Sequence, residues 1–122
     1  MIKLFNIKTS YNLGKSFEKK AADYLKKQGW QVIIMNYKTK LGEIDILAEK
    51  ANTLVAFEVK YRENESELPY VILPRQQKRI QNALLFFQQN NAKYNNYYLR
   101  LDAILISKSG INHIENAWEE II

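Results

Sequence analysis

Two runs of alternating apolar and polar character occupy residues 42–62, in the middle of the chain. Alternation with a period of two is typical of strands, in which successive side chains point to opposite faces. A polar segment at residues 49–53 separates the two runs and predicts a hairpin turn. In this hairpin, Asp45 on the first strand should share one surface with Glu58 and Lys60 on the second.

Helical spacing of apolar residues from Leu13 to Leu25 predicts an amphipathic helix. Asn12 would cap its start, and Gly29 would end it in a left-handed conformation. Residues 1–11 lack this pattern and are expected to form a loose, flexible arm. The other predicted elements are a strand at 30–37, a turn at 39–42, a loop at 63–70, a helix that begins at Pro74, a polar loop at 90–96, and two strands at 97–106 and 111–118 around a turn at 107–110.

This order of elements, α-β-β-β-α-β-β, predicts one α/β domain over residues 1–122. Three strands joined by short turns form an antiparallel meander, and a helix then leads to a fourth strand that can lie parallel to a neighbour. We therefore expect a mixed sheet with helices on both faces. The chain carries no repeat, low-complexity tract or linker that would mark a second domain.

Composition narrows the possible chemistry. The chain has no cysteine, which excludes disulfides, thiolate zinc sites and a cysteine nucleophile, and its single histidine, His113, excludes histidine-rich metal sites. Its longest apolar run, residues 83–87, is far shorter than the ~18 residues of a membrane span, and its N-terminus has no secretory pattern. We expect a cytoplasmic protein without membrane contact. The net charge of +5 is compatible with a nucleic-acid partner and equally with an ordinary basic protein.

Acidic side chains in the middle of apolar strands need partners, and a divalent cation is one such partner. Mg²⁺ prefers oxygen ligands and retains several waters, so two carboxylates are enough to bind it. Asp45 and Glu58 are the candidate ligands, for Mg²⁺ or alternatively Mn²⁺. Lys60 would orient an attacking water or stabilise negative charge in a transition state.

Asp45 followed by Glu58-Val59-Lys60 resembles the D…(D/E)-x-K signature of the PD-(D/E)xK nuclease superfamily. That superfamily has the restriction-endonuclease-like fold and includes archaeal Holliday-junction resolvases. The wider pattern is similar to the bacterial YraN-like family over nearly the whole chain after its first ten residues. This pattern consists of Gly14-x3-Glu18-x2-Ala21, GEID at 42–45, FEVKYR at 57–62 and Arg100-Leu101-Asp102.

The resemblance implies an αβββαβ core and a metal-dependent nuclease that acts on DNA, including branched or structured DNA. It also implies that the Val59 carbonyl is a third metal ligand and that Glu18 lies against the same site as a further acid. One departure concerns the second long helix, where family members often carry Lys-Gln and this chain has Gln76-Gln77. Lys78 would replace the missing lysine only if the helix were rotated.

Several alternatives remain open at this level. The candidates for nucleic-acid contact can equally form an ordinary solvated face; they are Arg62, Arg75, Gln77, Lys78 and Arg79. Asp45 and Lys60 can form a cross-strand ion pair without metal, Arg100 and Asp102 can form another, and His113 is expected to be structural or exposed. The chain could therefore also be a non-catalytic nucleic-acid-binding module or a structural protein. Its small surface suggests that specificity comes from DNA shape or from a homodimer.

Overall fold

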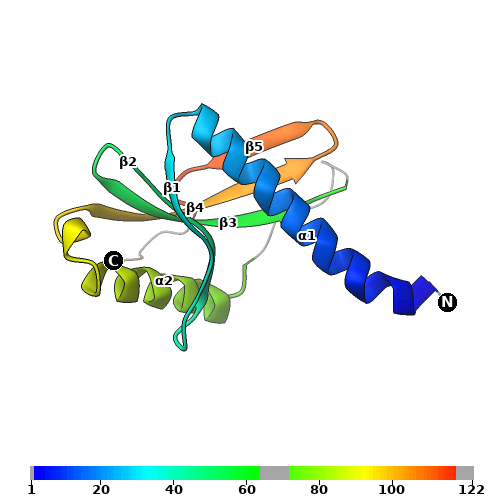
Figure 1. Cartoon of the computed structure of the whole chain (residues 1–122), viewed down its shortest axis with the longest axis horizontal. Helices are drawn as coiled ribbons and strands as arrows, with labels where there is room; N and C mark the ends of the chain where they lie inside the picture. Colours follow the sequence, from blue (N-terminus) through cyan, green and yellow to red (C-terminus); the bar gives the residue numbers. More distant parts are fainter. Residues whose placement is uncertain (1, 64–71, 118–122) are drawn as a thin grey trace.

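A five-stranded sheet lies between two long helices (Figure 1). The computed structural model describes the backbone of residues 2–63 and 72–117, and the side chains from residue 13 onward within those ranges. The elements in chain order are α1 (Ile2–Lys27), β1 (Gln31–Lys38), β2 (Glu43–Lys50), β3 (Thr53–Tyr61), α2 (Pro74–Gln89), the short 3-10 helix η1 (Ala92–Tyr94), β4 (Tyr98–Ser107) and β5 (Gly110–Ile114).

The strand order in the sheet is β1-β2-β3-β4-β5. Strands β1, β2 and β3 are antiparallel neighbours, β4 is parallel to β3, and β5 is antiparallel to β4. The crossover from β3 to β4 contains α2, as a parallel connection requires. The predicted α/β class, mixed sheet and αβββαβ order are therefore confirmed.

Each face of the sheet is covered by one helix (Figure 1). Side chains alternate along the strands, so every strand contributes residues to both faces. On one face, Leu25 of α1 packs in the same cluster as Ile46 and Phe57. On the other face, Leu84 of α2 packs in the same cluster as Leu47 and Ala56. The register pairs Ile46 with Phe57 and Leu47 with Ala56, so neighbouring rungs of the β2–β3 hairpin point to opposite helices.

The predicted element boundaries were partly wrong. Helix α1 begins at Ile2, so residues 2–11 continue the helix and Asn12 does not start it. The β2–β3 turn is shorter than predicted, because only Ala51 and Asn52 lie outside the strands, with φ of 50° and 60°. Gly29 ends α1 with φ of 96°, as expected. Strand β5 ends at Ile114, and Trp118 lies outside the described residues.

No helix in the described part of the chain is long and apolar enough to cross a membrane.

Candidate functional site

The β2–β3 hairpin opens at Asp45. Regular pairing of the two strands runs from the turn to Ile46–Phe57 and ends there. Two residues beyond Phe57 on β3, the Val59 N–H donates to Asp45 Oδ2 over 2.9 Å. The carboxylate of Asp45 therefore occupies the space in which a backbone partner of β3 would otherwise lie.

Asp45 and Glu58 form a hydrogen-bonded carboxyl pair at this opening. Burial, the charge of Glu58 and the hydrogen bond with Glu58 together raise the pKa of Asp45 to about 7, with burial as the largest cause. The Val59 N–H and the charge of Lys60 act in the opposite direction. Glu58 is only 6% exposed. Since the charge of Glu58 opposes ionisation of the adjacent, half-buried Asp45, Asp45 retains a proton up to near neutral pH in the absence of a metal and shares it with Glu58 through their hydrogen bond.

Glu58 is held by side chains from two elements. Lys60 Nζ lies 3.3 Å from Glu58 Oε2 on the same strand. Lys60 therefore forms its ion pair with Glu58, and the alternative of a cross-strand ion pair between Lys60 and Asp45 is not what the structure shows. Gln76 Nε2 of α2 donates to the same oxygen over 3.0 Å. The amide of Gln76 therefore contacts the acid without adding charge, at the position where the family resemblance predicts a lysine.

Glu18 reaches the pair from α1. Burial raises its pKa, as does the negative charge of Asp45, whereas a hydrogen bond with Asn36 and two lysines lower it. Its Oε1 is buried without a hydrogen-bond partner among the described residues. The structure therefore brings Glu18, Asp45, Glu58 and Lys60 into one region, as the sequence predicted for the last three and the family resemblance for Glu18.

The arrangement offers two carboxylates and a carbonyl to a cation. No group of three or more Asp, Glu or His side chains closes around one point within residues 13–63 and 72–117. In an antiparallel ladder the N–H and C=O of one residue point to the same side, so the Val59 carbonyl faces the strand edge on which its N–H meets Asp45. This donor set fits Mg²⁺, which is usually held by one or two carboxylates and completes its shell with water.

A cleft of about 140 Å³ opens beside the carboxyl pair. Its volume is enough for a cation with several waters, each of which takes about 30 Å³ in the liquid. The cleft is lined by Glu43, Asp45, Glu58, Gln76, Arg79 and Ile80.

The candidates for nucleic-acid contact separate into different environments. Arg79 lines the cleft, and Arg75 and Lys78 are exposed on the same helix. Gln77 instead donates its side-chain N–H to the Ile72 carbonyl over 2.7 Å, which holds the chain at the start of α2. Arg62 follows β3 and is partly buried.

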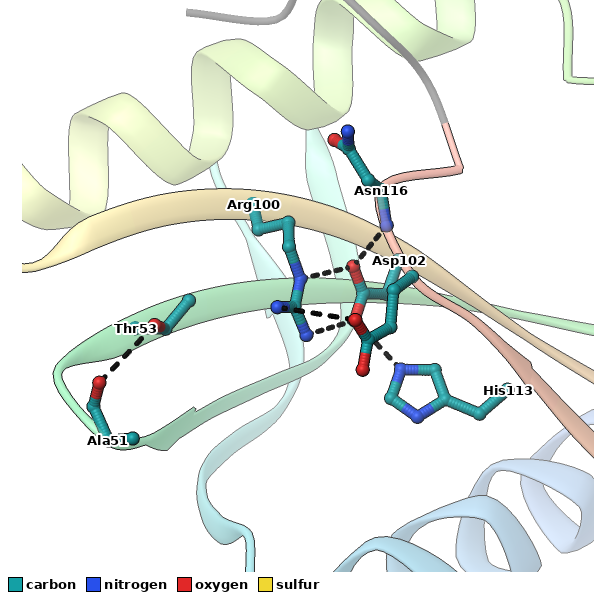
Figure 2. Close-up of polar contacts among 7 residues, drawn as sticks. Ala51, Thr53, Arg100, Asp102, His113 and Asn116 are labelled. Carbon is teal, nitrogen blue, oxygen red and sulfur yellow. Dashed lines mark hydrogen bonds and ion pairs between the residues drawn. The ribbon is translucent and has the colours of Figure 1, made fainter.

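A second polar cluster lies on the α1 face of the sheet (Figure 2). Asp102 is fully buried there and accepts two hydrogen bonds of 2.8 Å from Arg100. His113 Nε2 lies 2.8 Å from Asp102 Oδ2, and the Asn116 N–H donates to Oδ1 over 2.9 Å. The predicted Arg100–Asp102 ion pair and the structural role of His113 are confirmed, and the cluster is separate from the carboxyl pair.

Sequence reasoning missed the contacts of Gln76, Asn36 and His113. The sequence did point to position 76, because the family resemblance predicts a lysine there and this chain has Gln76. Asn36 adopts a left-handed φ of 53° within β1, a conformation that Asn tolerates better than most residues but that no local pattern indicated. His113 lies 11 residues from Asp102, and only the β4–β5 hairpin brings the two together.

The shared proton predicts an unusual pH dependence for the metal-free protein. Between pH 4 and 7 the folded chain retains a proton on Asp45 that the unfolded chain has released, so the free energy of unfolding should fall as pH rises. One such proton gives a slope on the order of 1.4 kcal/mol per pH unit. Urea unfolding in chelator at pH 5, 6, 7 and 8 measures this slope. Asp45→Asn should reduce it, and an identical slope in both proteins would contradict the shared-proton pair.

Known proteins resemble this chain over most of its length. The family model described as "Uncharacterised protein family UPF0102" matches residues 17–106. A UPF0102 protein of Rhodopseudomonas palustris is 38% identical over 112 residues, which cover 90% of this chain and 85% of the relative. A UPF0102 protein of Sulfurihydrogenibium sp. is 38% identical over 108 residues, which cover 86% of this chain and 92% of the relative.

Among solved structures, the match described as "Crystal structure of SSO0001" has a TM-score of 0.48 and 17% sequence identity. It covers 88% of this chain but only 52% of that longer chain. The family model and the curated relatives extend over most of this sequence, including the carboxyl pair. They show that the chain belongs to the UPF0102 family, a YraN-like family related to the PD-(D/E)xK nucleases.

Proposed function

We propose that this protein is a metal-dependent nuclease that hydrolyses phosphodiester bonds in DNA. The observation that carries the proposal is the pairing of Asp45 with Glu58 at the opening of the β2–β3 hairpin, with Lys60 bound to Glu58. A buried acid, Glu58, beside the half-buried Asp45 at the edge of a cleft is a costly arrangement for a fold, and a divalent cation would compensate that cost.

Asp45, Glu58 and the Val59 carbonyl are the groups that would hold the cation. Bound Mg²⁺ or Mn²⁺ supplies charge neutralisation at the phosphate and lowers the pKa of a coordinated water. Coordination requires ionised carboxylates, so the proton shared by Asp45 and Glu58 must leave when the metal arrives. Metal affinity should therefore increase with pH up to about the pKa of Asp45.

The surrounding residues have separate tasks. Lys60, which lies beside Glu58, would orient the attacking water or stabilise negative charge that develops on the phosphate. Gln76 positions Glu58 through its hydrogen bond. Glu18, with one unsatisfied carboxylate oxygen, would accept a hydrogen bond from water at the site. Arg79 lines the cleft and would contact a phosphate of the substrate.

The second candidate function is a nucleic-acid-binding module without catalysis. The basic net charge of +5 and the exposed cations of α2 suit either function. The carboxyl pair favours the nuclease, because a surface that only binds a polyanion gains nothing from clustered acids. A homodimer would supply the surface that a chain of this size lacks for sequence readout.

A cleavage screen tests the proposal. Linear, flapped and four-way DNA would be incubated with the protein in Mg²⁺, in Mn²⁺ and in chelator, with Asp45→Ala as the control. We expect cleavage of at least one substrate only when metal is present and only with Asp45 intact. DNA binding without cleavage in any metal would favour the binding module instead.

A further inference from the structure

A second hollow lies beside the acidic cleft, at the tip of the β1–β2 hairpin. It has a volume of about 790 Å³, which is within the range of ordinary ligand pockets. Its walls are largely apolar and come from two elements, the hairpin and the outer side of α2. The lining residues are Tyr37, Lys38, Thr39, Lys40, Leu41 and Phe86.

The hollow and the acidic cleft lie on either side of one backbone contact. The hairpin passes across α2 (Figure 1), and a Cβ built on Gly42 would lie only 2.0 Å from the Arg79 carbonyl oxygen. Only glycine allows this approach. Glu43 and Arg79 line the cleft on one side of the contact, whereas Leu41 and Phe86 line the hollow on the other.

The distance between the two sites is short. Arg79 and Phe86 are seven residues apart on α2, which places them on the same side of the helix and about 10 Å apart along its axis. Lys38 of β1 is the register partner of Glu43, so the hollow and the cleft meet at adjacent strand positions. A strand of nucleic acid in the cleft could therefore reach the hollow within a few nucleotides.

The lining has the chemistry of a stacking site. Tyr37 is fixed, because its ring packs edge-on against Phe87 with a centroid distance of 5.6 Å. Phe86 and Leu41 are large apolar side chains that remain 39% and 45% exposed. Lys38 and Lys40 are exposed on the hairpin beside them. Aromatic surfaces next to exposed lysines bind single-stranded nucleic acids, because bases stack on the rings while phosphates meet the cations.

We propose that this hollow binds an unpaired nucleobase, so that the preferred substrate carries single-stranded nucleotides close to the cleaved bond. The proposal rests on the nuclease function proposed above, because it identifies the substrate class of that site. A base inside an intact duplex is covered by its neighbours and cannot enter such a hollow. A polyanion also suits this surface better than a second copy of a chain with a charge of +5.

The test measures binding without cleavage. All proteins would carry Asp45→Asn and would be kept in chelator, and the probes would be labelled DNA. One probe is a blunt duplex, the second has the same duplex with a single-stranded extension, and the third has abasic nucleotides in that extension. Phe86→Ala should weaken binding of the extended duplex by about tenfold or more, since base stacking on an aromatic ring is lost. It should leave the blunt duplex unchanged.

Two controls make the result specific. Tyr98 is 75% exposed at the start of β4 and does not line the hollow, so Tyr98→Ala should bind all probes as the parent does. Phe86→Tyr retains a ring and should retain affinity. The parent protein should bind the abasic extension as weakly as Phe86→Ala binds the normal one.

An equal loss on blunt and extended duplexes, or no loss on either, would overturn the proposed base site. A shift from dimer to monomer in sedimentation without a change in DNA affinity would assign the hollow to a second copy of the chain. Binding that depends on Phe86, in a wild-type protein that cleaves nothing in any metal, would refute the nuclease and leave the base site standing. No binding to any probe would refute both.

Discussion

Alanine at Asp45, Glu58 or Lys60 is expected to lower metal-dependent cleavage by ~100-fold or more. The two acid substitutions remove the proposed metal ligands, and the lysine substitution removes the cation that pairs with Glu58. Single-turnover cleavage at saturating DNA measures the effect on the chemical step. Affinity for DNA in chelator should remain within a few-fold of wild type in all three variants.

Glu43 provides the matched control, because it lines the same cleft and lies on β2 two residues before Asp45. It is exposed and contributes no contact to the carboxyl pair that the structure describes. Glu43→Ala should therefore cleave at close to the wild-type rate. If it lost as much activity as Asp45→Ala, the cleft would act through its overall charge and not through a defined ligand pair.

Asp102→Ala is expected to lower the free energy of unfolding by about 3–5 kcal/mol. Asp102 is fully buried and has three partners, Arg100, His113 and the Asn116 N–H, each of which would lose its acceptor. A loss of this size is a large part of the stability of a typical domain. Urea unfolding at neutral pH measures it.

Asp23 is the control for this second effect, since its bridge of 3.3 Å to Lys19 is exposed on α1. Asp23→Ala should change stability by less than about 1 kcal/mol. A comparable loss in both variants would mean that the Asp102 cluster has no special role.

The same cluster should make the fold sensitive to acid. Burial alone would raise the pKa of Asp102, but the hydrogen bonds from His113, Arg100 and Asn116 outweigh burial and lower it. A lowered pKa contributes stability that is present above the ordinary pKa of an aspartate and is lost as pH falls through the value in the folded state. Asp45 acts in the opposite sense, so the two acids should define the pH range of greatest stability in chelator.

The strands and the faces of the carboxyl pair could be predicted because they depend on local periodicity. Alternation in residues 42–62 specifies which side chains share a surface, and a short turn leaves few possible registers. The charges of Asp45, Glu58 and Lys60 were visible as interruptions in apolar strands. In these places, local pattern and tertiary structure agree.

The remaining features depend on contacts between distant segments. The start of α1 was missed because residues 2–11 lack a clear cap and apolar stripe. The turn at Ala51–Asn52 was shorter than expected because non-glycine residues adopt left-handed conformations there. The opening between β2 and β3 follows from one side-chain bond to the Val59 N–H, which no sequence pattern specifies. For the same reason, the contact of Gln76 with Glu58 could only be seen in the folded chain.

Asp45 and Glu58 are proposed to form a site for a divalent cation that displaces their shared proton. Calorimetric titration with Mn²⁺ near pH 6.5, in two buffers with different ionisation enthalpies, measures both the binding and the proton release. We expect saturable binding by the wild-type protein with release of close to one proton per metal bound, and much weaker binding by Asp45→Asn. Equal Mn²⁺ binding by the two proteins, or no saturable binding by the wild type, would contradict the proposed site.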